Sequence, residues 1–329
     1  MISESIQNTF AGAHVVVTGG TGMIGREVVR RLKEFGAHVK VISLDKIDLK
    51  MGVEQQYGDL CDFNFCKDAV KGADYAFHIA GIKGSIEVTK SKPASFFVPL
   101  MMMNTNFLEA CRLAKVKKAV YTSSIGAYTS AEVLVENEKF EEGPPMDMFP
   151  GWAKRMAELQ VQAYRIQYQM NNIGVVRLCN VFGPGDNFDP ENAMVIPSLM
   201  WRIYRKENPV KIWGDGSAIR DFAFSGDVAE GVILALHHGT GGRYVNLGSG
   251  IGVTIRELVE ALHQVTDFNY EFDTSKSNGF PRRVLDISLA RQMIGYDPRT
   301  SLRDGLKQTW DWFIQNSHEY VNRKNYFAE

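Results

Sequence analysis

A run of closely spaced glycines near the start of the chain has the residue types and spacing to hold a pyrophosphate. It comprises Gly19, Gly22 and Gly25, with Met23 and Ile24 between the last two. Glycine lets the backbone turn tightly and approach a ligand, and the first amides of a helix donate hydrogen bonds to phosphate oxygens. Because a β-rich run precedes these residues and a helix-like run follows them, we expect a dinucleotide-binding loop rather than a simple packing turn.

Two acidic residues downstream suit the adenosine end of such a dinucleotide. Asp45 follows the second β-rich run, about 20 residues after the glycines, where a carboxylate accepts hydrogen bonds from ribose hydroxyls and repels a 2′-phosphate. This favours NAD over NADP, although the positive charge of the adjacent Lys46 would partly offset the repulsion of a 2′-phosphate. Asp59 and Leu60 fit a contact to the adenine edge, and a helix N-cap is the alternative role for Asp59.

The elements that must position these residues follow an alternating order. Short β-branched runs predict buried parallel strands, and the amphipathic stretches between them predict helices. The strands are expected at Val15–Thr18, Val39–Leu44, Tyr75–Ile79, Ala119–Ser123 and Ile173–Leu178, and the helices at 23–35, 62–71, 93–115 and 151–171. The alternation predicts an α/β fold with a doubly wound parallel sheet, which binds its ligands at the carboxyl ends of the strands.

The alternating pattern loosens after about residue 182, where Gly183-Pro184-Gly185 predicts a loop. Capping-box patterns at Thr254–Glu257 and Ser301–Asp304 predict the starts of two later helices. We therefore expect a nucleotide-binding domain at residues 1–180 and a smaller C-terminal substrate-binding lobe at 181–329. Strands and helices are free to cross between the two.

Composition and charge narrow the class of protein. A chain of 329 residues with a net charge of −1 offers no electrostatic basis for binding nucleic acid or an anionic membrane. It has no apolar run of about 18 residues and no secretory signal, so we expect a cytoplasmic protein. No metal site is predicted, because His237-His238 suits a helix end and the cysteines form no ligand cluster. We expect four reduced thiols, at Cys61, Cys66, Cys111 and Cys179.

Several further motifs resemble those of one family. They are His78-Ile-Ala-Gly81, Thr122-Ser-Ser-Ile-Gly-Ala-Tyr128, Asn180-Val-Phe-Gly-Pro184, Lys154-Arg-Met-Ala-Glu158, Val195-Ile-Pro197, Trp213-Gly-Asp-Gly216 and Phe272–Arg283. Together with the glycine loop they resemble the extended short-chain dehydrogenases/reductases, the NAD-dependent sugar-nucleotide epimerases and dehydratases, over nearly the whole chain. Within that family the pattern is most similar to the GDP-L-fucose synthases. The resemblance implies a Rossmann fold, bound NAD and a sugar nucleotide, GDP-linked, between the two lobes.

The catalytic set of that family is only partly present. The family uses a Tyr-x-x-x-Lys pair on one helix face, with an upstream serine or threonine that steadies the reacting oxygen. Ser124 and Lys154 match the serine and the lysine, but the tyrosine position holds Pro150. The fucose synthases also use a cysteine and a histidine to epimerise C3 and C5, and this chain has Gly126 and Met194 at those places. Epimerisation by that route and dehydration are therefore not expected, whereas hydride transfer is.

Other site residues follow from the same resemblance. Ala80, Gly81 and Lys83 are expected near the nicotinamide end of the cofactor, where Lys154 also holds the ribose. The residues expected to bind the sugar nucleotide are Ser124, Asn180, Val195, Trp213, Arg220 and Arg283. Lys83, Lys154 or an ordered water would replace the missing phenol as proton shuttle, and Tyr128 is a poorer candidate because tyrosine-containing members carry it too.

Two helices are implied as a subunit interface. In this family the helix at 93–115, which carries Met101-Met102-Met103, and the helix of Lys154 form a four-helix bundle between two chains, so the resemblance implies a homodimer. Methionines that fill an irregular core are the alternative interpretation.

The function expected from these residues is NAD-dependent hydride transfer at C4 of a GDP-linked hexose or heptose, as a 4-dehydrogenase or 4-ketoreductase. Pro150, Gly126 and Met194 stand where the family has catalytic residues. These replacements support a first alternative, a non-catalytic protein that binds NAD or a sugar nucleotide. A C4 epimerase that passes through a transient keto sugar ranks third.

Overall fold

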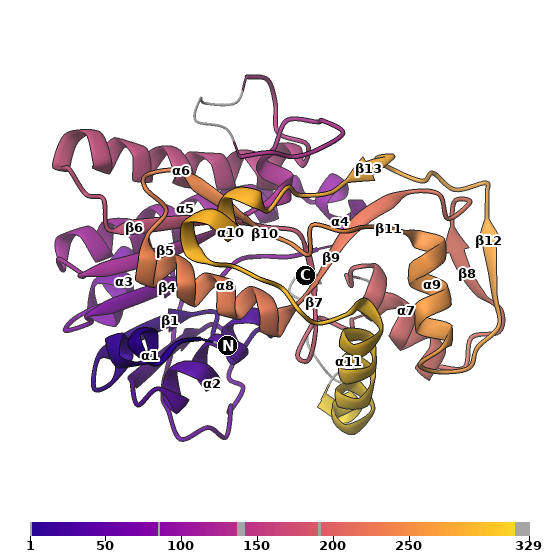
Figure 1. Ribbon diagram of the computed structural model, residues 1–329, viewed down its shortest axis with the longest axis horizontal. Helices are drawn as coiled ribbons and strands as arrows, with labels where there is room; N and C mark the ends of the chain where they lie inside the picture. Colours follow the sequence, from indigo (N-terminus) through magenta and orange to yellow (C-terminus); the bar gives the residue numbers. More distant parts are fainter. Residues whose placement is uncertain (1, 85, 137–141, 190–191, 320–329) are drawn as a thin grey trace.

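The computed structural model describes residues 2–84, 86–136, 142–189 and 192–319 (Figure 1). Within these residues, no helix combines the length and the apolar character needed to cross a membrane.

A seven-stranded parallel sheet forms the larger part of the molecule (Figure 1). Its strands are β1 (His14–Thr18), β2 (His38–Ser43), β3 (Glu54–Tyr57), β4 (Tyr75–His78), β5 (Lys118–Ser124), β6 (Ile173–Leu178) and β10 (Tyr244–Leu247). They lie in the order β10-β6-β5-β4-β1-β2-β3, so the chain winds outward in both directions from β1. This arrangement confirms the predicted doubly wound sheet. The central strands are mostly apolar because helices cover both faces.

Helices form a layer on each face of the sheet (Figure 1). On one side lie α1 (Glu4–Phe10), α2 (Met23–Glu34), α8 (Ser225–His238) and α10 (Ser288–Ile294), and on the other α3 (Phe63–Ala69), α5 (Pro93–Leu113) and α6 (Met148–Tyr168), with α4 (Ile86–Ser91) before α5. Strand residues alternate between the layers, so that Val17 packs on the first side and Val16 on the second. Helix α6 begins three residues earlier than predicted and ends where Gln169 takes a left-handed conformation (φ 54°).

The remaining elements build a smaller lobe around an aromatic core. Its strands are β7 (Asn180–Phe182), β8 (Val210–Trp213), β9 (Ile219–Phe224), β11 (Gly252–Thr254), β12 (Tyr270–Asp273) and β13 (Arg282–Arg283), and its helices are α7 (Val195–Tyr204), α9 (Ile255–His263) and α11 (Leu302–Asn316). Phe188 stacks on Phe313 with the ring centroids 4.2 Å apart. The capping box predicted at Thr254–Glu257 is confirmed, and Ser301 accepts a hydrogen bond from the Asp304 amide at the start of α11.

The chain crosses back from the smaller lobe to the large sheet. After β9, residues 225–247 form α8, which covers the sheet, and β10, which pairs with β6 through Val175 and Tyr244. Residues of the sheet thus come from both sides of position 180, the expected boundary. Residues 190–191 and 320–329 of the expected second lobe lie outside the described residues.

Candidate functional site

The glycine loop after β1 is shaped so that side chains would not fit. Gly19 has a φ of +67°, and a Cβ there would lie 2.8 Å from the backbone of Ala80. A Cβ on Gly25 would collide with the carbonyl oxygen of Gly19. Gly22 is the N-cap of α2, and no side chain caps that helix end. The loop therefore brings backbone together at the start of a helix, which is the geometry that binds a pyrophosphate.

The two acidic residues follow the next strands at the same edge of the sheet. Asp45 is half-buried just after β2, with Lys46 exposed beside it. Asp59 is exposed after β3, next to the buried Leu60, and its carboxylate accepts a hydrogen bond from the Cys61 amide at 2.8 Å. The N-cap of α3 is Asp62, so the structure does not use Asp59 for the alternative role considered for it.

A buried histidine ties the loop after β4 to the loop after β1. His78 Nδ1 lies 2.9 Å from Thr18 Oγ1, and its Nε2 lies 3.0 Å from Asn104 Oδ1. Burial lowers the pKa of His78 to about 3, so the ring is neutral. Thr18 Oγ1 also accepts the amide of Ala80 at 3.1 Å, which fixes the start of Ala80-Gly81 beside Gly19. His78 is therefore a positioning residue for the expected cofactor loop.

Lys154, on α6, is tied to the carboxyl end of β5, the strand that ends at Ser124. Lys154 Nζ donates to the carbonyl oxygen of Thr122 at 2.8 Å and lies within 4 Å of the place that a Cβ on Gly81 would take. Burial lowers the pKa of Lys154 to about 8, so its ammonium can give up a proton near neutrality. Ser124 Oγ accepts the Gly126 amide at 3.1 Å at the start of the short 3-10 turn Ile125–Ala127. The Ser124 hydroxyl thus accepts a backbone hydrogen bond, as a serine that only caps a turn would, at the position expected for a catalytic serine.

Tyr128 does not replace the missing phenol. Pro150 is the third residue of α6, where the missing N–H costs the helix nothing. Tyr128 is 3% exposed, donates to Asn246 Oδ1 at 2.8 Å and packs against the guanidinium of Arg177. Burial raises the pKa of Tyr128 well above its ordinary value. Its hydroxyl is therefore committed to the core.

Two arginines form the substrate side of the candidate site. Arg220 on β9 and Arg283 on β13 are register partners on adjacent strands. Burial, together with the neighbouring Arg283, lowers the pKa of Arg220 to about 10. The Nε of Arg283 is buried and has no hydrogen-bond partner among the described residues. Two cations held together with a donor to spare suit an anion such as a diphosphate.

The other residues predicted to bind the substrate have different structural roles. Asn180 donates to the carbonyl oxygen of Asp221 at 3.1 Å, which holds β7 to β9. Val195 is the first residue of α7 and packs on the core of the smaller lobe, directly after Met194, the N-cap of that helix. Trp213 is 60% exposed at the end of β8, which Figure 1 places at the far end of the smaller lobe. The structure therefore does not gather Trp213 with the others.

Lys83 joins the loop after β4 to the loop after β7. Its Nζ lies 3.2 Å from Oδ1 of Asp186, whose side chain is almost fully buried. Asn192 donates to the carbonyl oxygen of Lys83 at 3.2 Å, which strengthens the same contact. Lys83 is therefore held between the loops that follow β4 and β7 rather than lying on an isolated loop.

Asp147 is the site residue that the sequence analysis missed. It precedes α6, and its carboxylate lies against Gly126, so closely that a Cβ on that glycine would collide with it. Its Oδ1 accepts from a terminal nitrogen of Arg283 at 2.9 Å. The sequence signal that would have identified Asp147 is an acidic residue within one helical turn of Pro150, where the family has its tyrosine. Gly126, where the fucose synthases have their cysteine, leaves room for that acid.

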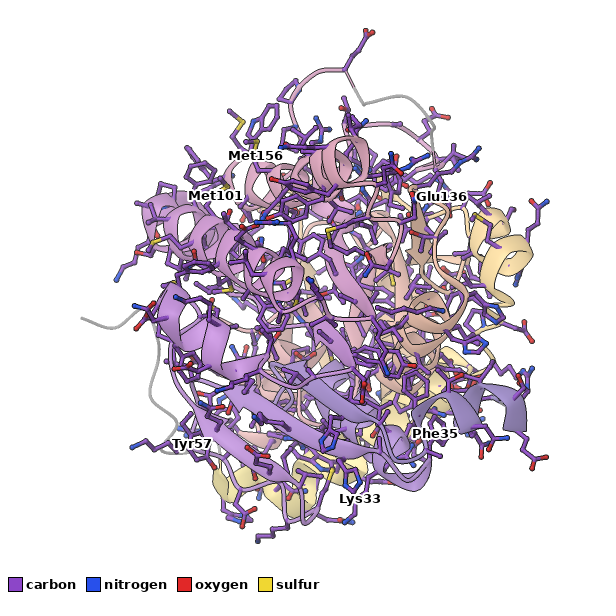
Figure 2. All side chains as sticks on the ribbon, turned by 90° about the vertical axis from the view of Figure 1, so that its left-hand side faces the viewer. Lys33, Phe35, Tyr57, Met101, Glu136 and Met156 are labelled. Carbon is purple, nitrogen blue, oxygen red and sulfur yellow. The ribbon has the colours of Figure 1, made fainter. Side chains whose placement is uncertain are left out.

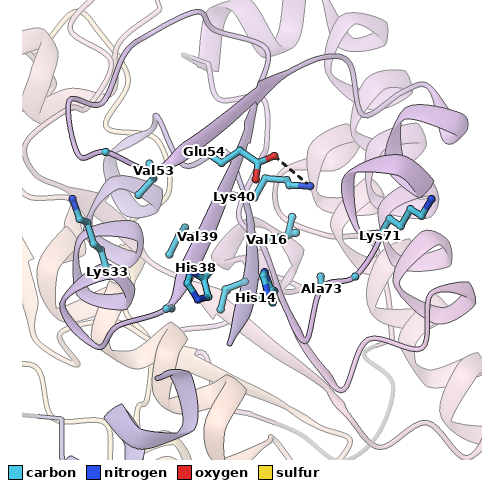
Figure 3. Close-up of a pocket in the computed structure, with 14 residues that line it drawn as sticks. His14, Val16, Lys33, His38, Val39, Lys40, Val53, Glu54, Lys71 and Ala73 are labelled. Carbon is cyan, nitrogen blue, oxygen red and sulfur yellow. Dashed lines mark ion pairs between the residues drawn. The ribbon is translucent and has the colours of Figure 1, made fainter. Parts of the chain in front are cut away.

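A separate hollow lies at the opposite, amino-terminal edge of the sheet (Figure 3). The basic side chains that line it are His14, Lys33, His38, Lys40 and Lys71. His14 and His38 stand at the starts of β1 and β2 with their rings stacked, and Lys40 pairs with Glu54 at 3.5 Å. Ligands of parallel α/β sheets bind at the carboxyl edge, so this hollow is not the cofactor site. Elsewhere in the described part of the chain, no group of three or more histidine, cysteine or acidic side chains is placed to hold a metal ion.

The model of the NAD dependent epimerase/dehydratase family matches residues 15–248. GDP-L-fucose synthase 1 of Arabidopsis thaliana is 32% identical, over 95% of this chain and 97% of its own. Among solved structures, an epimerase of Methanothermobacter thermautotrophicus matches with a TM-score of 0.86 at 26% identity, over 96% of both chains. The UDP-glucose 4-epimerase of Thermotoga maritima, solved with UDP-glucose, matches with a TM-score of 0.79 at 27% identity, over 92% of this chain and 99% of its own.

Proposed function

The chain belongs to the NAD dependent epimerase/dehydratase family, and from that premise we propose that it transfers hydride between NAD and C4 of a GDP-linked sugar. Membership confirms the predicted resemblance and NAD as the cofactor. The relatives support an NAD-dependent enzyme that acts on sugar nucleotides, and the linkage and the reacting carbon are our inference.

The observation that carries the proposal is the contact of Lys154 with both the carboxyl end of β5, the strand that ends at Ser124, and the loop after β4. Lys154 is tied to β5 two residues before Ser124 and lies beside Gly81, in the loop that Thr18 fixes next to Gly19. A protein that only sensed a dinucleotide would not need a lysine with its pKa lowered to about 8 at this point. When bound, NAD would supply or accept the hydride, while Ser124 would hold the reacting oxygen and Lys154 the ribose.

The nature of the substrate is inferred from the two arginines and from what is absent. Arg220 and Arg283 suit the diphosphate of a sugar nucleotide, and the Arabidopsis relative is a GDP-L-fucose synthase by name. Neither Gly126 nor Met194 can move a proton at C3 or C5. We therefore propose a GDP-linked hexose or heptose that is oxidised or reduced at C4 and not epimerised.

Near-UV absorbance of the reduced nicotinamide tests the proposal directly. The purified protein is loaded with NAD or NADH and mixed with GDP-mannose, with its 4-keto-6-deoxy derivative, and with UDP- and dTDP-linked counterparts. We expect a change in absorbance with a GDP-linked sugar, and its sign gives the direction of hydride transfer. Bound cofactor with a flat trace for every sugar would contradict the proposal and favour a binding protein.

We further propose a homodimer built from α5 and α6. Both helices carry exposed apolar side chains along their outer faces, namely Val98, Met102 and Leu113 on α5 and Met148, Phe149, Met156, Ile166 and Tyr168 on α6. Figure 2 shows this face, with Met101 and Met156 on the two helices. Apolar stripes on two adjacent helices suit burial against the same pair in a second chain, which forms a two-fold four-helix bundle.

A further inference from the structure

We propose that Asp147 is the residue that exchanges a proton with the sugar hydroxyl during hydride transfer, in place of the phenol that is missing at Pro150. The inference rests on the proposed function, because it assigns the proton carrier of that same reaction. It departs from the proton carriers expected from the sequence, which were Lys83, Lys154 or an ordered water.

The first observation is the fit between Asp147 and Gly126. The carboxylate of Asp147 occupies the space that any side chain at position 126 would need, so the two positions are complementary. Gly126 follows Ser124 by two residues, and its amide donates to Ser124 Oγ at 3.1 Å. The turn from Ser124 to Gly126 thus contacts both the Ser124 hydroxyl and the Asp147 carboxylate, and from this we infer that the acid lies beside the expected position of the reacting oxygen.

The second observation is that Asp147 does not perform the structural task its position offers. Asp147 is the N-cap residue of α6, and aspartate at that place ordinarily accepts amide hydrogen bonds from the first turn. Here its side chain makes no capping hydrogen bond. The carboxylate is turned instead toward Gly126 and Arg283, which holds its Oδ1 at 2.9 Å. Helix formation therefore does not explain the orientation.

The other candidate proton carriers are engaged elsewhere. Tyr128 is buried and donates to Asn246. Lys83 pairs with Asp186, and Lys154 donates to the carbonyl oxygen of Thr122. The side chain of Asp147 pairs with Arg283 through one carboxylate oxygen and is 38% exposed, so it can reach a ligand and also return a proton to solvent.

The proposed step balances as a simple oxidation of an alcohol. The C4–H bond breaks and its electron pair leaves as hydride to NAD, while the hydroxyl proton passes to a carboxylate oxygen of Asp147. The products are a 4-keto sugar, the reduced cofactor and a neutral Asp147, which releases its proton to water. In the reverse direction a protonated Asp147 donates to the oxygen as hydride arrives at C4.

Single-turnover absorbance with NADH and the 4-keto-6-deoxy derivative of GDP-mannose tests this assignment. We expect the rate for Asp147→Asn to fall by about 10²-fold or more, with the binding of cofactor and sugar, measured by calorimetry, within about threefold of wild type. Asp147→Ala leaves an open space beside Gly126, and added formate should restore part of its rate, which loss of a structural contact would not allow. Asp297→Asn removes a matched exposed partner of an arginine, Arg299, and should leave the rate unchanged.

Each outcome separates this inference from the proposed function. A wild-type protein that transfers hydride while Asp147→Asn does so equally fast would overturn the inference and leave the proposed function intact. So would an Asp147→Ala variant that binds both ligands but gains nothing from formate. A wild-type protein that transfers no hydride to any sugar nucleotide overturns both. Gly126→Ala, which displaces the carboxylate without deleting it, should be slowed to the same degree as Asp147→Asn.

Discussion

At the scale of single residues, Pro150 is the position where this chain can be returned to the family pattern. A tyrosine there would lie one helical turn before Lys154, on the same face of α6. We expect Pro150→Tyr to raise the single-turnover rate of hydride transfer by about 10²-fold, the lower end of what a general acid–base contributes, because Asp147 already carries part of that task.

The matched control for this variant is Pro150→Phe, which adds the same ring without the hydroxyl. Equal rates for the two variants would show that packing at the start of α6, not a phenol, causes any change. A combined Pro150→Tyr and Asp147→Asn variant should regain most of the rate lost by Asp147→Asn alone.

Lys154 gives a second residue-scale prediction, on stability rather than rate. Its pKa falls from an ordinary 10.5 to about 8 in the folded protein, so the unfolded chain binds more protons between these values. The cofactor-free wild type should therefore gain stability as pH rises from about 8 to 10.5. Lys154→Met removes the buried ammonium and should be more stable than wild type at pH 7, by at most about 3 kcal/mol.

Urea unfolding of both proteins at pH 7 and pH 10 measures this difference. Titration of other groups affects wild type and variant alike, so the difference in unfolding free energy between them is the informative quantity. It should shrink toward pH 10, and a difference that is constant with pH would show that the ammonium is not destabilised by burial.

The sequence could predict Ser124 and Lys154 because they keep their spacing from neighbouring motifs. It could not predict Asp147, because its contact with Gly126 joins the start of α6 to a turn about 20 residues earlier, and the loop between them has no periodic pattern. For the same reason the contact of Lys83 with Asp186 was unforeseen, since it spans the two lobes. Contacts between loops depend on the assembled fold and not on local residue types.

At the scale of elements, we expect the junction of β1 with α2 to control cofactor binding. Gly25→Ala would place a methyl group against the carbonyl oxygen of Gly19, so the loop or the helix start must move. We expect the affinity for NAD, measured by calorimetry, to fall at least about 10²-fold, or about 2.7 kcal/mol. Gly72→Ala strains a turn with a φ of +76° where no atom lies nearby, and it should cost stability without changing NAD affinity. Similar affinities for the two variants would contradict the assigned loop.

The elements themselves were largely predictable because their patterns are local. The β-branched runs predicted the five central strands, with ends that differ from the structure by at most one residue. The start of α6 was predicted at residue 151, because a proline such as Pro150 is common at the start of a helix. In the structure the helix begins earlier and contains that proline in its first turn. Strand β10 was not assigned, because four residues in the middle of the sequence expected for the smaller lobe give no sign that they return to the large sheet.

At the scale of the whole molecule, the apolar faces of α5 and α6 predict the oligomeric state. A combined Met102→Glu and Ile166→Glu variant puts charge on both helices, where the side chains are 44% and 75% exposed. We expect the wild type to run as a dimer and the variant as a monomer in light scattering during size-exclusion chromatography. Ile314→Glu on α11 is the control of similar exposure and should remain dimeric. A monomeric wild type would contradict the proposed interface.

The return of the chain to form β10 has a consequence for how this protein is made. When a ribosome has released β6, the edge of that strand has no partner until residues 244–247 emerge, much later in synthesis. An unpaired apolar strand edge invites pairing with other nascent chains. A fragment that stops near residue 180 should therefore aggregate when expressed. To fold in another protein, the cofactor-binding part would have to include α8 and β10.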